Sequence, residues 1–525
     1  MKNKYRSYQQ LMSLFIFFAT LCSSVTVHAL EIKRVDDPWD NYYALEDESL
    51  GEVIGTDGIE LSVARNEHPV AAVELFNDTN STLFLRLLVK GPQDVLTLRE
   101  GVHVRVRLGQ LVADVLPEIG ADGGLAIAAG ESRQLWVDFD TEQLEVGQHV
   151  WQLQVVDLVG GALHEIDFEL TLNSLILPEE HPLSLVVWDC SLQESRGLAQ
   201  EIRADELTNG YVNAFHVIDK APALFSAVGE MIEAPDFTEL DATIIPLIGK
   251  GQLLLRCATP RLFLAGGNRL SIETELGQQA YAQWVQALLV HLDKLGLTYD
   301  DWVLYPYDED IRDHYYYTVK VAKSVDSKIR TYANPTLKSK RAHLDRLIDE
   351  DLVDYLQLHH AYYQLGDNPA YIEQLRQKYN GTLSIYWCPV VQKRLDPVGF
   401  YRRMAWVAWN HGLSGTGYWT VYGLGGHQNQ GDWGGTAWDD FRSRTANPTT
   451  LYNGRNDILI PSRRWRGFRA GLEDYLYLDL LEQQLATQSS DEGNQLLRQA
   501  QRIYVDDFSP QEINSLRKDI IAYLN

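Results

Sequence analysis

One repeated pattern dominates the chain from residue 184 onward: short apolar segments alternate with segments whose apolar residues recur at helical spacing. The strand-like segments are residues 184–188, 243–247, 253–257, 302–306, 328–332, 353–360, 383–388 and 415–422. The helical segments are residues 273–295, 313–323, 337–349, 369–379 and 397–411. Such alternation predicts a parallel α/β sheet. About eight units in roughly 240 residues favour a TIM-like (β/α)8 barrel over an open sheet, although the pattern is weakest between residues 189 and 239.

Residues 31–180 have a different rhythm, with short alternating runs separated by Asn, Gly, Asp and Pro. The runs lie at 70–76, 82–89, 102–108, 134–139 and 149–156, which predicts an all-β sandwich. The sequence LPEEHP at 177–182 is typical of a linker, and the pattern is helical from Ile460 onward. We therefore expect a β-sandwich at 30–180, a (β/α)8 barrel at 181–485 and a C-terminal helical segment at 486–525.

The first 29 residues have the three parts of a secretory signal peptide. Lys2, Lys4 and Arg6 form a basic region, an apolar run follows at 11–21, and VHA at 27–29 offers small residues for cleavage. The apolar run is too short to span a bilayer, and no other segment is apolar enough. These features predict an exported protein, periplasmic or secreted, that begins near Leu30 and has no membrane span.

The charge and the motifs of the chain exclude several classes of function. Removal of residues 1–29 leaves 43 basic and 72 acidic side chains, a net charge of −29, which repels nucleic acid. Three cysteines remain (Cys190, Cys257 and Cys388), a sparse odd set that favours core thiols over a disulfide framework. No nucleophile elbow, phosphate-binding loop, dinucleotide fingerprint or zinc motif is present, so we predict no cofactor and no metal. The sequence does not indicate an oligomeric state.

Polar and aromatic side chains gather at the predicted ends of the barrel strands, where barrel enzymes place their active sites. They are Asp189, Tyr307, Asp308, Glu309, Asp310, Asn334, His359, His360, Trp387, Tyr418 and Trp419. Carboxylates can transfer protons and aromatic rings can hold a sugar, so this composition is typical of glycosidases. A glycan or oligosaccharide is therefore the expected partner.

The segment WVLYPYDED at 302–310 is the leading candidate. Neighbouring residues of a strand point to opposite faces, so Asp308 and Glu309 can share a site only if the strand has ended, as Pro306 suggests. Two adjacent carboxylates raise the pKa of one of them, which suits a general acid. The alternative is a solvated loop in which Asp310 or Asp313 caps the next helix.

Three other polar features have structural alternatives. Glu473 and Asp474 follow Arg469 on a helix, and the i,i+4 spacing predicts an ion pair of Arg469 with Glu473. His359 and His360 point apart on a strand, so one of them is a candidate sugar contact or a core histidine. The Gly-rich segment 423–438, with Trp433 and Trp438, is either one wall of a cleft or a solvent loop.

Several segments together resemble family 123 of the glycoside hydrolases and its uncharacterised relatives. They are YPYDED at 305–310, IYWCP at 385–389, GTGYWTVYG at 415–423, NDILIPSRRWRGFRAGLEDYLYLDLLE at 456–482 and LSVARNEHPVAAVELFN at 61–77. The resemblance covers roughly residues 50–485, and its most specific part is the segment 456–482. It implies a β-sandwich followed by a (β/α)8 barrel.

The resemblance also implies a chemistry, because characterised members of the family are retaining β-N-acetylgalactosaminidases in which the substrate's 2-acetamido oxygen attacks the anomeric carbon. Asp308 would then polarise the acetamido group and Glu309 would act as general acid and base. Tyr386, Tyr418 and Trp419 would form a sugar-holding wall, and Asn334 a polar contact. Members of the family often have proline after the acidic pair, where this sequence has Asp310.

Two alternatives use the same scaffold. A glycosidase acting on a sugar without an acetamido group would use Asp308 as nucleophile, with Asp189 or Asp310 as its partner. A carbohydrate-binding or envelope protein would keep the fold without catalysis, because a fold does not guarantee an activity.

Overall fold

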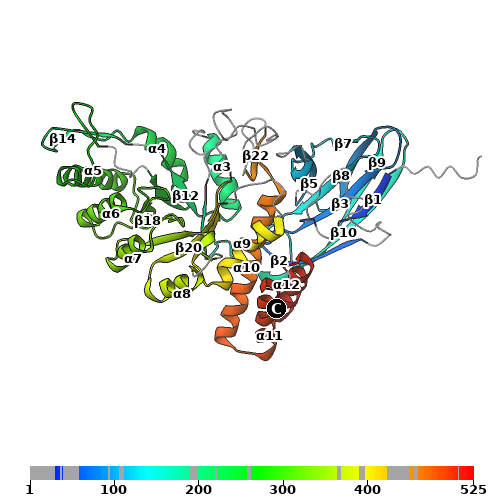
Figure 1. Cartoon of the computed structure of the whole chain (residues 1–525). Coiled ribbons are helices and arrows are strands. Elements are labelled where there is room, and N and C mark those ends of the chain that lie inside the picture. Colours follow the sequence, from blue (N-terminus) through cyan, green and yellow to red (C-terminus); the bar gives the residue numbers. More distant parts are fainter. Residues whose placement is uncertain are drawn as a thin grey trace, which may run out of the picture.

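The computed structural model describes residues 30–35, 38–39, 58–92, 95–105, 111–188, 198–218, 221–256, 262–363, 368–388, 397–421, 449–454, 459–505 and 508–525. They form a β-sandwich, a (β/α)8 barrel and a group of C-terminal helices, with these helices between the other two parts (Figure 1). The predicted fold class is confirmed. Among the described residues, no helix combines the length and the apolar character needed to cross a bilayer.

The sandwich contains two five-stranded sheets, ordered β1-β3-β8-β5-β6 and β2-β10-β9-β4-β7. The strands are β1 (Leu30–Arg34), β2 (Ile59–Arg65), β3 (Val70–Asn77), β4 (Leu83–Lys90), β5 (Leu96–Arg105), β6 (Leu111–Val115), β7 (Gly124–Ile127), β8 (Ser132–Phe139), β9 (Gly147–Asp157) and β10 (Leu163–Ile176). Residues of β4 alternate between buried and exposed at its start, as expected for a strand with one face on a core. Trp151, Leu153 and Phe168 are among the apolar residues buried between the sheets.

The barrel is an eight-stranded parallel sheet in the order β17-β15-β12-β11-β21-β20-β19-β18. The strands are β11 (Ser184–Val187), β12 (Ala214–Val217), β15 (Gln252–Leu255), β17 (Trp302–Leu304), β18 (Tyr332–Ala333), β19 (Tyr355–His359), β20 (Thr382–Trp387) and β21 (Gly415–Tyr418). A parallel bridge between Leu304 and Thr331 joins the two edge strands. The strand before the three acids is therefore the fourth of the barrel, as the sequence predicted.

The prediction of a strand at residues 243–247 is wrong. This segment ends helix α4 (Thr238–Ile244) and forms the following 3-10 turn η1 (Ile245–Leu247). Ile244 and Leu247 are buried on one side of the helical segment, and a short apolar run of this kind fits a strand equally well. The second barrel strand is instead β12, which lies within the region where the alternation is weakest.

Most of the remaining elements cover the barrel strands or connect them, while the C-terminal helices lie between the barrel and the sandwich (Figure 1). The helices are α3 (Leu198–Asn209), α5 (Glu275–Lys294), α6 (Asp313–Val325), α7 (Arg341–Asp349), α8 (Asn368–Lys378), α9 (Arg403–Asn410), α10 (Arg463–Thr487), α11 (Asp491–Val505) and α12 (Pro510–Leu524), with shorter turns η3 (His360–Tyr363) and η4 (Pro397–Arg402). Small sheets are formed by β13 (Ala223–Phe225), β14 (Met231–Glu233) and β16 (Leu262–Leu264), and by β22 (Leu451–Asn453) and β23 (Leu459–Pro461). In α5, the Thr274 hydroxyl accepts a hydrogen bond from the Gly277 N–H, and the stripe of Trp284, Leu288 and Leu292 is buried.

Side chains of each barrel strand alternate between the barrel interior and the surrounding helices. Val186, Ala214, Leu254, Val303 and Tyr332 belong to one small cluster inside the barrel. Their neighbours along the strands belong to the large core shared with the helices. This parity decides which residues at the strand ends can meet inside the barrel.

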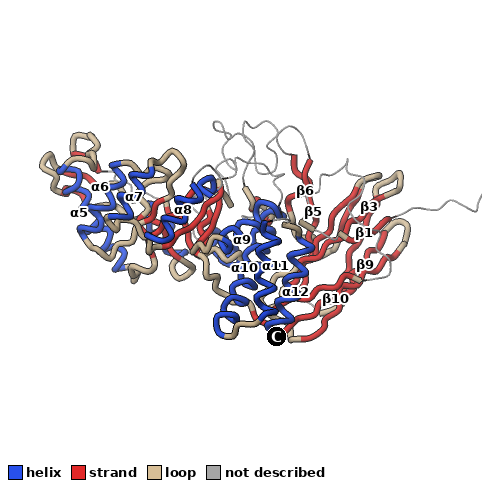
Figure 2. Tube along the Cα trace, turned by 60° about the horizontal axis from the view of Figure 1, so that its bottom comes forward, coloured by secondary structure: helices blue, strands red, loops and turns tan. Residues whose placement is uncertain are grey.

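Helix α10 joins the sandwich to the barrel (Figure 2). On the sandwich side, the Arg464 guanidinium pairs with Asp114 at 2.8 Å, and both side chains are almost fully buried. On the barrel side, Arg402 pairs with Asp474 at 2.7 Å and is equally buried. The predicted ion pair of Arg469 with Glu473 is present at 3.8 Å. Glu473 and Asp474 thus lie in a structural network.

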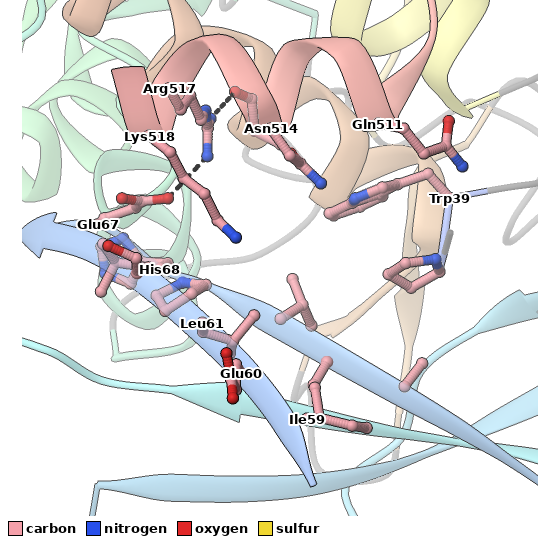
Figure 3. A pocket seen from close by; sticks show the side chains of 18 of the residues that line it. Trp39, Ile59, Glu60, Leu61, Glu67, His68, Gln511, Asn514, Arg517 and Lys518 are labelled. Carbon is pink, nitrogen blue, oxygen red and sulfur yellow. Dashed lines mark hydrogen bonds and ion pairs between the residues drawn. The ribbon is translucent and has the colours of Figure 1, made fainter. Parts of the chain in front are cut away.

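Helix α12 packs beside this network and encloses a cavity of about 510 Å³ against the sandwich. Figure 3 shows Asn514, Arg517 and Lys518 on the helix facing Glu67 and His68 beyond the end of β2. Nη1 of Arg517 lies 2.7 Å from Oε1 of Glu67, and Nε of Arg517 lies 2.6 Å from Oδ1 of Asp474. One guanidinium therefore links the sandwich to α10.

Candidate active site

The chain turns directly after the fourth barrel strand. Strand β17 ends at Leu304, Tyr305 and Pro306 are buried, and Glu309 has φ of +55°. Left-handed backbone costs a non-glycine residue about 1–2 kcal/mol, and such conformations gather at functional sites. Because this turn breaks the alternation of the strand, Asp308 and Glu309 both reach side chains that point into the barrel.

Asn334 holds the two acidic residues together. It follows β18, and its side chain is fully buried. Its Nδ2 donates to Oδ1 of Asp308 at 2.9 Å, while its Oδ1 accepts the backbone N–H of Glu309 at 2.9 Å. A single amide thus fixes the position of one carboxylate and the backbone of the next residue.

Tyr386 and His359 lie beside Glu309. The Tyr386 hydroxyl, on β20, donates to Oε1 of Glu309 at 2.6 Å. Burial and this hydrogen bond to Glu309 raise the pKa of Tyr386, so the phenol remains a donor. The His359 ring, at the end of β19, packs edge-on against Tyr386 with ring centroids 5.1 Å apart. The structure therefore brings Asp308, Glu309, Asn334, Tyr386 and His359 into one cluster.

Two further side chains, which the sequence analysis did not single out, also bind Asp308. The Tyr305 hydroxyl donates to Oδ1 of Asp308 at 2.8 Å, and Nη2 of Arg256 lies 3.3 Å from its Oδ2. Arg256 directly follows β15, which was predicted as a strand, so its place at a strand end was a usable signal. Donors on both oxygens fix Asp308 as an acceptor.

Trp419 and Tyr418 are neighbours with different surroundings. Trp419 is half-buried and packs against the cluster inside the barrel, on the same side as the acids. Tyr418 is fully buried between Tyr401 and Phe468, and its hydroxyl bonds with Thr450. The structure brings Trp419 to the interior side and places Tyr418 in the helical layer.

The prediction that His359 and His360 point apart is wrong: their ring centroids lie 4.3 Å apart, because the strand ends at His359 and His360 begins the turn η3. Their other ring contacts differ. His360 stacks on Trp387 with ring centroids 5.2 Å apart, in contact with the outer layer through Phe400. Their neighbours His359 and Tyr386 are the members that pack together on the interior side. Cys388, which follows Tyr386, is a free, partly buried thiol whose pKa is raised to about 11 by burial and by the charges of Glu309 and Asp308.

Asp310 has partners of its own. Its carboxylate accepts from Nε of Arg312 at 2.7 Å and lies 3.2 Å from Nε2 of His314. The hydrogen bond from Arg312 is the main reason that the pKa of Asp310 is lowered. Helix α6 begins after Arg312 without a side-chain cap, so neither Asp310 nor Asp313 caps it.

Some predicted residues lie outside the described part of the chain. They are Asp189, Cys190, Cys257 and the whole Gly-rich segment 423–438, including Trp433 and Trp438. Within the described ranges, no group of three or more His, Cys, Asp or Glu side chains could hold a metal ion.

A buried histidine lies inside the barrel beneath these residues. His216, on β12, is 2% exposed, stacks on Trp188 at 3.8 Å, and neither ring nitrogen has a hydrogen-bond partner in the described chain. Burial, with a smaller effect of the Arg256 charge, lowers the pKa of His216 to about 3. The native state therefore holds this imidazole neutral at a pH where an unfolded chain would protonate it.

This predicts acid destabilisation that His216→Phe relieves. The folded pKa is depressed, so between pH 6.5 and about 3 the unfolded state binds the extra proton and the free energy of unfolding falls as pH falls. Each pKa unit corresponds to about 1.4 kcal/mol. Water that enters around the protonated ring lowers the cost of charging it, so the loss is smaller than the full pKa difference implies. We expect His216→Phe to remove about 2–3 kcal/mol of this loss. Denaturant titrations at pH 4 and 7 measure the free energy of unfolding of wild type and His216→Phe. The substitution His149→Phe, in the sandwich, is the control. Equal pH profiles for wild type and His216→Phe would contradict the prediction.

Comparison with solved structures gives an extensive match. The structure of a family 123 glycoside hydrolase from Clostridium perfringens, described in terms of glycolipid glycan hydrolysis, superposes with a TM-score of 0.70 at 11% sequence identity, over 95% of this chain and 98% of that chain. The chain has the fold of a family 123 glycoside hydrolase. Because the superposition covers 95% of this chain, it includes both the sandwich and the barrel described above.

Other comparisons are weaker. A xylanase from Thermoanaerobacterium saccharolyticum matches with a TM-score of 0.37 at 11% identity, over 55% of this chain and 95% of that chain. A xylanase from Caldicellulosiruptor owensensis matches with a TM-score of 0.34 at 11% identity, over 53% and 94%. No family model and no curated protein matches the sequence. The family 123 fold is thus recognised from the structure.

Proposed function

We propose that the protein is an exported glycoside hydrolase that cleaves β-linked N-acetylhexosamine glycosides of the N-acetylgalactosamine type with retention. The observation that carries this proposal is the pair of adjacent acidic residues at the end of the fourth barrel strand, both held by Asn334. The family 123 structure it resembles is described in terms of glycan hydrolysis, which agrees with this class of substrate.

In the proposed reaction, the substrate supplies the nucleophile. Asp308 accepts a hydrogen bond from the N–H of the 2-acetamido group, and the acetamido oxygen attacks the anomeric carbon. As that C–O bond forms, the bond to the leaving group breaks, and Glu309 gives its proton to the leaving oxygen. Glu309 then takes a proton from water, which attacks the anomeric carbon and opens the cyclic intermediate. Two attacks from opposite faces retain the configuration.

The surroundings of the two acids support these separate roles. Arg256, Tyr305 and Asn334 hold Asp308 as an acceptor, which is what polarising an amide N–H requires. Glu309 is more exposed than Asp308 and is contacted by the Tyr386 hydroxyl, so it can reach a leaving group and water. Trp419 and His359 are the proposed sugar contacts, while buried Tyr418 supports the strand.

The test is a screen of chromogenic glycosides with wild type and Asp308→Asn. We expect turnover of N-acetyl-β-hexosaminides and inhibition by a thiazoline that mimics the cyclic intermediate. Asp308→Asn should lower this rate about 10²-fold, because a group that stabilises the developing charge is lost. Turnover of plain hexosides only, insensitive to the thiazoline, would favour a nucleophilic role of Asp308. Tight glycan binding without turnover across the screen would favour a binding protein.

Export rests on the pattern in residues 1–29. We expect protein expressed with this segment to be recovered outside the cytoplasm with Leu30 as its first residue. N-terminal sequencing of periplasmic and medium fractions measures this, and an intact N-terminus in the cytoplasmic fraction alone would contradict it.

A further inference from the structure

A second cavity lies at the opposite end of the barrel from the acids. It has a volume of about 880 Å³ and is enclosed by β2, β5, β8, the end of α3 and the start of α10. Asn209 and Gly210 line it directly before β12, so it adjoins the N-terminal ends of the barrel strands. The residues placed in the candidate active site do not contribute to it.

Four arginines line this cavity in a chain whose net charge is −26: Arg65, Arg99, Arg466 and Arg469. Two of them share one carboxylate, because Nε of Arg99 and Nη2 of Arg466 both lie 2.6 Å from Oδ2 of Asp138. Asp138 therefore compensates one of these two charges.

The other two arginines are poorly paired. The Arg469 side chain is 11% exposed, and its ion pair with Glu473 is long, at 3.8 Å. Nε of Arg65 and Nε of Arg469 are buried without a hydrogen-bond partner in the described chain. Buried donors are normally satisfied, so each of these two Nε–H groups has room for an acceptor that the described chain does not supply.

The charges around Arg466 also favour an anion in this cavity. Burial lowers the pKa of Arg466, and the charges of Arg99 and Arg469 lower it further, against the opposing effect of Asp138. Positive charge on the inner wall therefore exceeds what Asp138 offsets. Acids also line the cavity: Asp140, Glu142 and Glu179 are exposed, where water screens them. Glu206 is half-buried, and its charge, like that of Asp138, acts to raise the pKa of Arg466.

The remaining lining suits a polar ligand with hydroxyl groups. Asn209 and Gln143 offer amides, and Tyr211 and Trp465 offer aromatic surface. Arginine is the side chain that best matches a planar carboxylate or a sulfate, through paired N–H donors. We infer that this cavity binds an oxyanion, the carboxylate or sulfate of an acidic saccharide, with Arg65 and Arg469 as its main ligands. This site does not depend on the reaction proposed for Asp308 and Glu309.

The test is isothermal titration of the full chain at constant ionic strength with D-glucuronate, N-acetylgalactosamine 6-sulfate, inorganic sulfate and neutral D-glucose. We expect saturable binding of at least one anionic probe and none of glucose. Arg65→Gln and Arg469→Gln should each weaken binding about tenfold or more, since a charge-assisted hydrogen bond contributes more than the 1.4 kcal/mol of one decade. Arg376→Gln, on the outer surface of α8, is the matched control and should bind like wild type.

Each outcome decides the inference. A sulfated sugar that binds more tightly than inorganic sulfate identifies a saccharide as the source of the oxyanion, and equal affinities identify the free anion. If Arg469→Gln does not fold, as circular dichroism would show, Arg65→Gln and Arg65→Lys carry the test, because lysine keeps the charge and loses the paired donors. No saturable binding of any anionic probe, or undiminished binding in the arginine variants that fold, would overturn the inference.

Discussion

Glu309→Gln should lower the hydrolysis of an N-acetyl-β-hexosaminide with an alkyl or sugar leaving group by about 10²–10⁴-fold, the usual contribution of a general acid. Glutamine keeps the size of the side chain and can still meet the Tyr386 hydroxyl, but it has no proton to give to the leaving oxygen. Steady-state rates on natural-type glycosides measure the loss. Circular dichroism should show an unchanged fold, because Glu309 is exposed.

The leaving group separates this role from a structural one. With a nitrophenyl glycoside, whose leaving group needs little protonation, Glu309→Gln should lose much less of the bond-cleavage rate. Asp310→Asn is the matched control, because Asp310 is bound to Arg312 and His314 and should have little effect on the rate. Equal losses on both kinds of substrate, or full activity in Glu309→Gln, would remove Glu309 from the proposed mechanism.

Asp474→Ala should destabilise the protein by about 3–5 kcal/mol, the cost of removing one partner from a buried ion pair. The Asp474 carboxylate is 1% exposed and contacts Arg402, Arg517 and Trp406. Its loss leaves two guanidinium groups buried without their main counter-charge. Because burial alone would raise its pKa, the lowered pKa of Asp474 reflects the charges of Arg402 and Arg517.

Equilibrium unfolding in denaturant measures this prediction. Asp479→Ala is the control on the same helix, because Asp479 is partly exposed and bonds only with Gln483 in the described chain. We expect its effect to lie within about 0.5 kcal/mol of wild type, as for most surface substitutions. A loss below 1 kcal/mol in Asp474→Ala would mean that the arginines find other partners.

Much of the fold could be predicted because its periodicities are long and clear. Strands such as β19 (YLQLH) and β20 (TLSIYW) are rich in apolar and aromatic residues, and α5 carries an apolar stripe over 20 residues. The second strand, β12, is only four residues long, and the helical segment at 243–247 has the same apolar density as a strand. Nothing in such short runs distinguishes the two structures.

The sequence predicted which residues lie at the ends of the barrel strands, and these ends form the candidate site. Asp308, Glu309, Asn334 and Tyr386 meet because parallel strands deliver their carboxyl ends to one side of the barrel. The family resemblance did not separate Tyr418 from Trp419, although adjacent strand residues face opposite sides and only one of them could line the interior. Arg256 was missed because the sequence analysis considered acids, amides and aromatic residues at the strand ends, although β15 and β17 pair directly and bring Arg256 to Asp308.

The bond between Glu67 and Arg517 also bears on how the chain is made. The two residues are 450 positions apart, so a ribosome must synthesise the whole barrel before Glu67 can meet its guanidinium. This contact between the sandwich and the C-terminal helices can therefore form only after α12 has been synthesised.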